Sequence, residues 1–228
     1  MNNNQKPKTA LLVGASGLVG GHCLQFLLEE PSYTKVTALG RKPLTIVHDK
    51  LDQHVIDFGE LETLGEYLIA EDVYCCLGTT IKKAGTQEAF RKVDFDYPIK
   101  LAALTQHCGA NQFLIVSSLG ADPHSRIFYN RVKGEMEEAI RKMQFMAFHV
   151  FRPSLLLGDR KEHRTGEKVG AVAMTALKPA MIGPLKKYRA IQARNVAKAM
   201  VHVAQMGLQG VNIFESQRIQ EIADGKDG

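Results

Sequence analysis

The sequence contains no tryptophan, only four cysteines and no stretch of 18 apolar residues that could cross a membrane. The cysteines, at positions 23, 75, 76 and 108, do not show the Cys-x-x-Cys spacing of zinc sites. Cys75 and Cys76 are neighbours on one predicted strand, so a disulfide framework does not fit either. We therefore expect buried core thiols and no metal site.

The chain also lacks the charge imbalance that is typical of nucleic-acid-binding proteins. Its 29 Lys and Arg residues are interleaved with 24 Asp and Glu residues, and no run of five like charges occurs. Residues 1–6 lack the apolar core of a secretion signal. These absences predict a cytoplasmic protein with neither nucleic acid nor membrane as a partner; the partner expected from the site described below is a small-molecule substrate. A protein partner stays open, as does the choice between a monomer and a small homo-oligomer.

What is present is an ordinary globular composition, 45% hydrophobic and 23% charged, over 228 residues, a length that fits one domain. Short apolar strands alternate with amphipathic helices, which predicts an α/β fold: a doubly wound, Rossmann-like parallel sheet with helices on both faces. The expected domain is 1–228, with 153–228 as a small C-terminal appendage on the substrate side. The expected strands are 8–13, 35–39, 54–57, 72–77, 113–116, 147–151 and 211–214, and the expected helices are 18–30, 61–68, 87–107, 127–143, 169–177 and 193–205.

Three glycines, Gly14, Gly17 and Gly20, lie where the first predicted strand becomes the first helix. The spacing alone is weak evidence in a chain with 20 glycines, but the placement is specific. Glycine lets the backbone turn tightly and approach a pyrophosphate, whose charge then lies at the amide end of the helix. This turn predicts a dinucleotide site.

The second predicted strand ends in Gly40, Arg41 and Lys42, where enzymes that use NAD usually carry an acidic residue for the ribose hydroxyls. Two cations there, with Ser16 in the preceding turn, suit a 2′-phosphate instead. The sequence therefore predicts NADP(H) in preference to NAD(H).

Tyr129 and Lys133 are four residues apart and so share one helix face. Ser117 and Ser118 end the fifth predicted strand at its carboxyl end, where open parallel sheets bind ligands. A phenol with an ordinary pKa near 10 transfers protons poorly at neutral pH, whereas a nearby ammonium favours the phenolate. These residues predict a Ser-Tyr-Lys catalytic site. Tyr129 follows Ser117 by 12 residues and Ser118 by 11, and either serine fits the role.

These residues, in this order, resemble the short-chain dehydrogenase/reductase superfamily. The segments 75–80, 116–122, 129–135 and 150–153 resemble more narrowly its Tat-interacting-protein oxidoreductase branch of atypical members. The likeness covers about residues 9–164 and implies NADPH as the cofactor. It also implies a set of cofactor contacts: Ser16, Gly17, Leu18, Val19, Arg41, Lys42, Leu77, Gly78, Tyr129, Lys133, Leu156 and Arg164.

The function expected from these features is reversible hydride transfer between NADPH and a small carbonyl or alcohol substrate. One alternative is an NADPH-sensing regulatory or protein-interaction module without turnover. A second is an epimerase that uses bound cofactor transiently. The substrate cleft is expected to be shallow, with its far wall drawn from residues 154–185.

Overall fold

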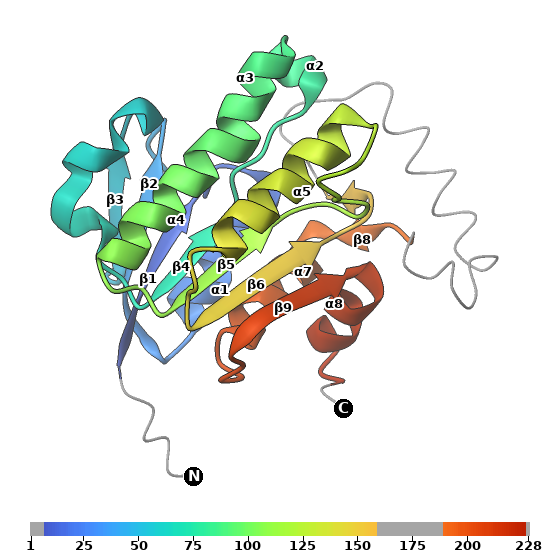
Figure 1. Ribbon diagram of the computed structural model, residues 1–228. Helices are drawn as coiled ribbons and strands as arrows, with labels where there is room; N and C mark the ends of the chain where they lie inside the picture. Colours follow the sequence, from blue (N-terminus) through green and yellow to red (C-terminus); the bar gives the residue numbers. More distant parts are fainter. Residues whose placement is uncertain (1–6, 159–188, 227–228) are drawn as a thin grey trace.

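The computed structural model describes residues 7–158 and 189–226. Their main sheet is parallel throughout and has the order β3-β2-β1-β4-β5-β6-β9 (Figure 1). This order confirms the predicted doubly wound, Rossmann-like sheet. The strands are β1 (Lys8–Val13), β2 (Tyr33–Gly40), β3 (Leu51–Val55), β4 (Asp72–Cys75), β5 (Gln112–Val116), β6 (Ala147–Arg152) and β9 (Gly210–Glu215).

Helices cover both faces of the sheet, because successive strand residues point to opposite sides. Ala10 and Leu12 pack in one core with α1 (Leu18–Glu29), α7 (Ala193–Val203) and α8 (Ser216–Ala223). Leu11 and Val13 pack in the other core with the 3₁₀ segment η1 (Phe58–Leu68), α4 (Tyr97–His107) and α5 (Phe128–Arg141). Figure 1 shows α4 and α5 in front of the sheet and α1 and α7 behind it. None of the helices in the described ranges is long and apolar enough to cross a membrane.

The predicted continuous helix over 87–107 is wrong in detail. The segment divides into α3 (Gln87–Arg91), a π-helical turn η2 (Lys92–Asp96) and α4, with a short helix α2 (Ile81–Ala84) ahead of it. The wider turn brings Asp94 to a fully buried position. Helix α8 and the two-stranded sheet of β7 (Leu156–Leu157) and β8 (Ile191–Gln192) were not predicted.

Two other boundaries differ from the prediction. β3 ends at Val55 instead of beginning near His54, and η1 is 3₁₀ rather than α-helical, with Gly65 at a φ of +49° inside it. The expected helix at 169–177 and most of the proposed cleft wall lie outside the described residues.

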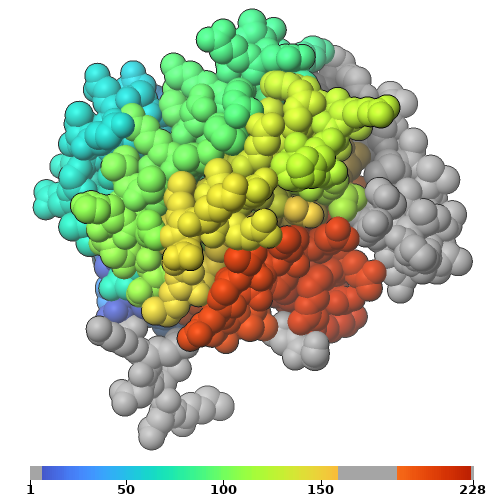
Figure 2. Space-filling view, viewed as in Figure 1, coloured from blue at the N-terminus to red at the C-terminus, as the bar shows by residue number. Residues whose placement is uncertain are grey.

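β9 is an edge strand, covered on one face only. Phe214 is buried against the α7 and α8 side, whereas Val211 and Ile213 on the opposite face are 46% and 49% exposed. Figure 2 shows the red C-terminal segment along the outer side of the yellow segment that contains β6. Alternation of buried and exposed residues along this strand follows from that one-sided cover.

Polar contacts close the amino end of the sheet. The buried Asp72 carboxylate accepts hydrogen bonds from the Tyr33 hydroxyl at 2.6 Å and from the Gln112 amide at 3.0 Å, and Lys8 Nζ lies 3.4 Å away. Burial raises the pKa of Asp72 in spite of these partners. The backbone carbonyl of Ala204, directly after α7, accepts hydrogen bonds from Lys8 and Gln112. The predicted site residues within the described ranges lie toward the opposite, carboxyl end.

Candidate functional site

The site is centred on the point where the strand order reverses, between β1 and β4. The pairing of Val13 with Cys75 places Gly14 beside Cys76, and the Cys76 amide donates to the Val13 carbonyl at 2.8 Å. Ligands bind at such switch points because the connections leave the sheet in opposite directions there. The glycine turn and the residues after β4 therefore face one crevice.

The turn from β1 into α1 can only be made by glycine. Gly14 has a φ of +92°, and a Cβ atom there would lie 2.6 Å from the Cys76 carbonyl oxygen. A Cβ atom on Gly20 would lie 2.1 Å from the carbonyl oxygen of Gly14. The Gly17 amide closes the turn by donating to that same carbonyl at 2.9 Å. These contacts hold the first turn of α1 directly against the end of β1.

The amide end of α1 is left open to an anion. Gly17 caps the helix without a side-chain hydrogen bond, and the first turn carries no acidic residue. Leu18 is partly exposed, whereas the Val19 side chain is buried in the core and Gly20, which has no side chain, is buried too. Val19 and Gly20 can therefore meet a ligand only through their backbone amides. The free amides and the helix dipole suit a pyrophosphate.

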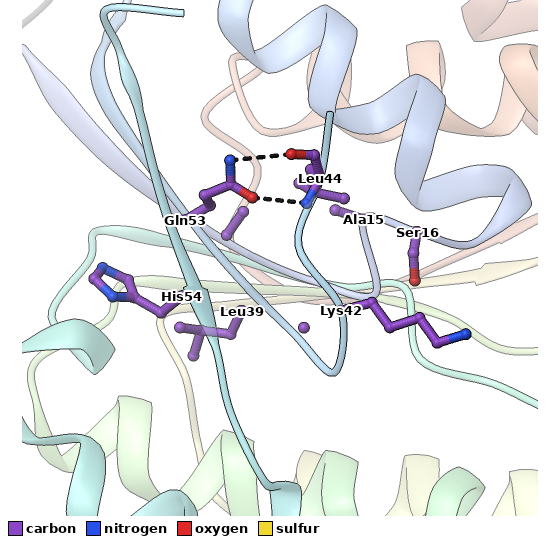
Figure 3. A pocket seen from close by; sticks show the side chains of 9 residues that line it. Ala15, Ser16, Leu39, Lys42, Leu44, Gln53 and His54 are labelled. Atoms are coloured by element: carbon purple, nitrogen blue, oxygen red, sulfur yellow. Dashed lines mark hydrogen bonds between the residues drawn. The ribbon is translucent and has the colours of Figure 1, made fainter. Parts of the chain in front are cut away.

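A pocket lies between this turn and the end of β2, lined among others by Ser16, Gly40, Lys42 and Leu44. Arg41 and Lys42 are both exposed, and Figure 3 shows the side chains of Lys42 and Ser16 on the same side of the turn. The structure thus brings Ser16 and Lys42 together in the lining of this pocket, whereas Arg41, the third predicted phosphate ligand, is exposed beside Lys42 and does not line the pocket. Their arrangement suits a small anion beside the dinucleotide turn.

The segment 41–44 after β2 contains Arg41 and Lys42, and we call it the basic turn. The side chain of Gln53 on β3 holds this turn in place, a contact that the sequence analysis did not predict. Its side-chain amide accepts from the Leu44 amide at 2.8 Å and donates to the Leu44 carbonyl at 3.3 Å (Figure 3). A side chain that satisfies both backbone groups of one loop residue fixes that loop. No feature of the local pattern indicates this contact, since the partners belong to different elements.

Leu77 and Gly78 follow β4 at the same edge, where a Cβ atom on Gly78 would lie 3.5 Å from Asp94 and 4.0 Å from Lys133 Nζ. Leu156 lies in β7, and nearby Gly158 approaches Leu18 so closely that a Cβ atom would be 2.9 Å from the leucine methyl group. The chain after β6 therefore returns to the start of α1. Arg164 lies outside the described residues.

Lys133 reaches from α5 into the space between the ends of β4 and β5. Its Nζ lies 2.8 Å from Asp94 Oδ1 and 3.5 Å from the Val116 carbonyl oxygen, and its side chain is 4% exposed. Burial alone would lower the pKa of Lys133, but the Asp94 carboxylate raises it above its ordinary value. Lys133 is therefore an ammonium at physiological pH. Asp94 was not predicted as a site residue.

The two adjacent serines have different surroundings. The Ser117 hydroxyl donates to the Glu137 carboxylate, which also binds the Arg152 guanidinium at 3.1 Å from Nε. The Ser118 hydroxyl is buried and has no hydrogen-bond partner within the described ranges. A buried hydroxyl without a partner is costly unless a ligand satisfies it. The Ser117 hydroxyl is therefore occupied by a structural contact, whereas the Ser118 hydroxyl is available to bind a ligand.

Tyr129 is the second residue of α5, one helical turn before Lys133. Its ring is partly exposed and packs against the buried Phe90 ring at a centroid distance of 5.3 Å. This contact places the ring against α3, and the spacing of four residues puts Tyr129 on the same face of α5 as Lys133. Lys133 and Ser118 lie at the carboxyl end of β5, and Tyr129 precedes Lys133 by one helical turn.

Comparison with known proteins places these features in context. The model of the NAD dependent epimerase/dehydratase family matches residues 10–214. Protein HTATIP2 of Rattus norvegicus is 34% identical over 226 residues, which is 97% of this chain and 91% of the rat protein. The mitochondrial protein FMP52 of Candida albicans is 29% identical, over 89% of this chain and 90% of its own length.

Solved structures give the same fold. UDP-glucose 4-epimerase of Thermotoga maritima superposes with a TM-score of 0.69 at 15% identity and covers 96% of this chain and 84% of its own. MoeE5, solved in complex with UDP-glucose and NAD, gives a TM-score of 0.68 at 13% identity and covers 96% and 82%. At these identities the likeness establishes only the architecture.

The predicted cytoplasmic location is wrong by this comparison. The relatives of this chain from the fungi Candida albicans, Coccidioides immitis and Emericella nidulans are named as mitochondrial proteins. The prediction depended on the missing apolar core of a secretion signal. Mitochondrial targeting segments are amphipathic rather than apolar, so that absence argues against secretion and not against mitochondria.

Proposed function

The chain belongs to the NAD dependent epimerase/dehydratase family, and from this membership we propose that it is an NADPH-dependent oxidoreductase acting on a small carbonyl or alcohol substrate. The observation that carries the proposal is the unpartnered, buried Ser118 hydroxyl at the strand end that Tyr129 and Lys133 also reach. A dinucleotide site alone would suit a sensor. A free hydroxyl beside a phenol and an ammonium suits a reaction in which an oxygen gains or loses a proton.

The described residues fit a nicotinamide dinucleotide. Gly14 and Gly20 allow β1 and the first turn of α1 to pack backbone against backbone, and the uncapped amide end of α1 carries no acidic residue that would repel a pyrophosphate. Gly14, Ser16, Gly17, Leu18, Val19 and Gly20 would hold the pyrophosphate side, together with Leu77, Gly78 and Leu156. When bound, the cofactor supplies a carbon that donates or accepts hydride.

The remaining chemistry belongs to the chain. Ser118 donates a hydrogen bond to the substrate oxygen and holds it near the Tyr129 hydroxyl. In the reductive direction Tyr129 gives its proton to that oxygen as the carbonyl carbon receives hydride, and in the oxidative direction it takes the proton back. Lys133 would hold the nicotinamide ribose by a hydrogen bond, and its ammonium lies one turn of α5 from Tyr129, on the same helix face. Ser117 is structural, since its hydroxyl is engaged by Glu137.

Arg41 is expected to give preference for NADPH over NADH. A hydrogen bond to a charged group contributes about 1.5–3 kcal/mol, so Arg41→Ala should weaken NADPH binding roughly 10- to 150-fold and leave NADH binding nearly unchanged. Fluorescence titration with both cofactors measures the two affinities. Lys35→Ala is the matched control, because Lys35 pairs with Asp52 on the surface. Equal losses for the two cofactors in Arg41→Ala would show that the residue does not bind the 2′-phosphate.

A screen of carbonyl compounds for NADPH oxidation tests the reaction, and Ser118→Ala against Ser117→Ala tests the site. Ser118→Ala should lower kcat at least tenfold, because the substrate oxygen loses its hydrogen bond, and leave the melting temperature nearly unchanged. Ser117→Ala should instead lower the melting temperature, because the buried Glu137 loses a donor. The assignment of the serines is reversed if these two effects exchange places.

Epimerisation is the second candidate, because the matching family is described by epimerases and dehydratases. In that reaction the hydride returns to the substrate and no net NADPH is consumed. Product analysis of the same screen, with absorbance at 340 nm followed alongside, separates the two reactions. A protein that binds NADPH tightly but changes none of the compounds tested would favour the sensing role instead.

A further inference from the structure

A buried carboxylate that the proposed mechanism does not use lies against Lys133. Asp94 belongs to the π-helical turn η2, and its side chain is 1% exposed, with Oδ1 2.8 Å from Lys133 Nζ. The two charges come from different helices, α5 and the turn that precedes α4. Burial of both partners means that solvent screens their interaction little.

The carboxylate is itself fixed by a second contact. Its Oδ2 accepts a hydrogen bond from the Thr79 amide at 2.8 Å, in the loop that follows β4. Gly78, the preceding residue, lies beside the pair: a Cβ atom there would be 3.5 Å from Asp94 Oδ1 and 4.0 Å from Lys133 Nζ. Asp94 thereby connects Lys133 to the loop that carries the predicted cofactor contacts Leu77 and Gly78.

The groups that act on the Lys133 ammonium come from three elements. Asp94 faces it from η2, Tyr129 from α5 and Cys75 from β4, and the Val116 carbonyl lies 3.5 Å away. Of these described groups, Asp94 is the carboxylate that pairs with the ammonium and so offsets the cost of burying it. Without the Asp94 carboxylate, burial would lower the pKa of Lys133, and the ion pair that fixes the direction of its side chain would be lost.

We propose that Asp94 is a positioning residue that holds the Lys133 ammonium at the nicotinamide ribose and the Tyr129 phenol. The inference rests on the proposed function, because it assumes that Lys133 binds the cofactor. It adds a fourth side chain to the Ser-Tyr-Lys site. That side chain acts only through Lys133.

The test is the pH dependence of NADPH affinity in Asp94→Asn, measured between pH 7.5 and 9.5 by fluorescence titration. The parent protein should bind with the same affinity across this range, because the carboxylate keeps Lys133 protonated. In Asp94→Asn the dissociation constant should rise with pH and be roughly tenfold larger than the parent's at pH 9.5. A change of this size corresponds to the loss of the hydrogen bond from the charged Lys133 to the cofactor. Asp96→Asn is the control, since Asp96 is exposed in the same turn.

A double variant separates positioning from a general structural role. If Asp94 acts through Lys133, then adding Asp94→Asn to Lys133→Met should leave NADPH affinity where Lys133→Met alone puts it. The melting temperature of the double variant should also exceed that of Asp94→Asn, because the uncompensated buried ammonium is gone. This second readout holds even where Asp94→Asn binds no cofactor or folds poorly.

Two results would overturn the inference in different ways. A flat pH dependence in Asp94→Asn, with clear weakening in Lys133→Met, would remove the role of Asp94 and leave the proposed function intact. Unchanged NADPH affinity in Lys133→Met would remove the cofactor role of Lys133, and with it both proposals. Additive losses of melting temperature in the double variant would assign Asp94 to the Thr79 loop alone.

Discussion

Replacement of Tyr129 by phenylalanine is expected to lower kcat by about 10²- to 10⁴-fold, the usual contribution of a positioned proton donor. The ring remains, so its packing on Phe90 and the fold of α5 should persist. NADPH affinity should change little, because the proposed cofactor contacts lie mainly in the glycine turn, the basic turn and Lys133. Stopped-flow or steady-state rates on a compound from the screen, together with a cofactor titration, measure both quantities.

Tyr97→Phe is the matched control for this variant, since it also removes one phenol hydroxyl from a partly buried ring, here one that packs against Phe58. It should retain the parent rate. Parent-like turnover in Tyr129→Phe would contradict the mechanism, because no other described phenol reaches the end of β5. A loss of NADPH affinity as large as the loss of rate would assign Tyr129 to binding instead.

Gly20→Ala is expected to abolish tight NADPH binding and to lower stability. The added Cβ atom would lie 2.1 Å from the Gly14 carbonyl oxygen, so α1 must move away from the end of β1. Overpacking of this kind costs about 1–3 kcal/mol in stability, and backbone contacts leave little room for relief. Displaced amides would no longer meet the pyrophosphate, so affinity should fall at least tenfold. Thermal melting and fluorescence titration measure the two losses.

Gly21→Ala provides a control one residue away. There the Cβ atom would meet only the Ala15 carbonyl oxygen at 3.4 Å, an ordinary contact, within the same helix. Alanine favours helix over glycine by about 0.8–1 kcal/mol, so this variant should be as stable as the parent or more stable, and should bind NADPH normally. If Gly20→Ala and Gly21→Ala behave alike, the close contact with the Gly14 carbonyl oxygen does not explain the losses in Gly20→Ala.

The sequence alone predicted those parts of the fold that local patterns determine. The apolar runs of β1, β5 and β6 and the glycine turn were readable because strand burial and the turn are properties of consecutive residues. The family resemblance was confirmed by the match to the family model and to the rat protein. Tyr129 and Lys133 could be paired because four residues make one helical turn.

The parts that were missed depend on contacts between distant elements. Asp94 lay inside a predicted regular helix, and only the π-helical turn brings it to Lys133. The choice between Ser117 and Ser118 could not be made either, because neighbouring residues end the strand together and only Glu137, on α5, engages one of them. Gln53 hydrogen-bonds the backbone of Leu44, nine residues earlier in a loop, and no periodic pattern in the sequence indicates such a contact.

The packing of α7 on α1 bears on how a newly made chain reaches this fold. Leu24 and Leu27 of α1 share one core with Val196 and Met200 of α7, about 170 positions later, and Ala204 then closes the amino end of the sheet. At ordinary rates of translation the ribosome needs roughly 10 to 30 s to cross that interval. During this time a nascent chain carries α1 with its apolar face uncovered. We therefore expect emerging chains to depend on chaperones until α7 has left the exit tunnel.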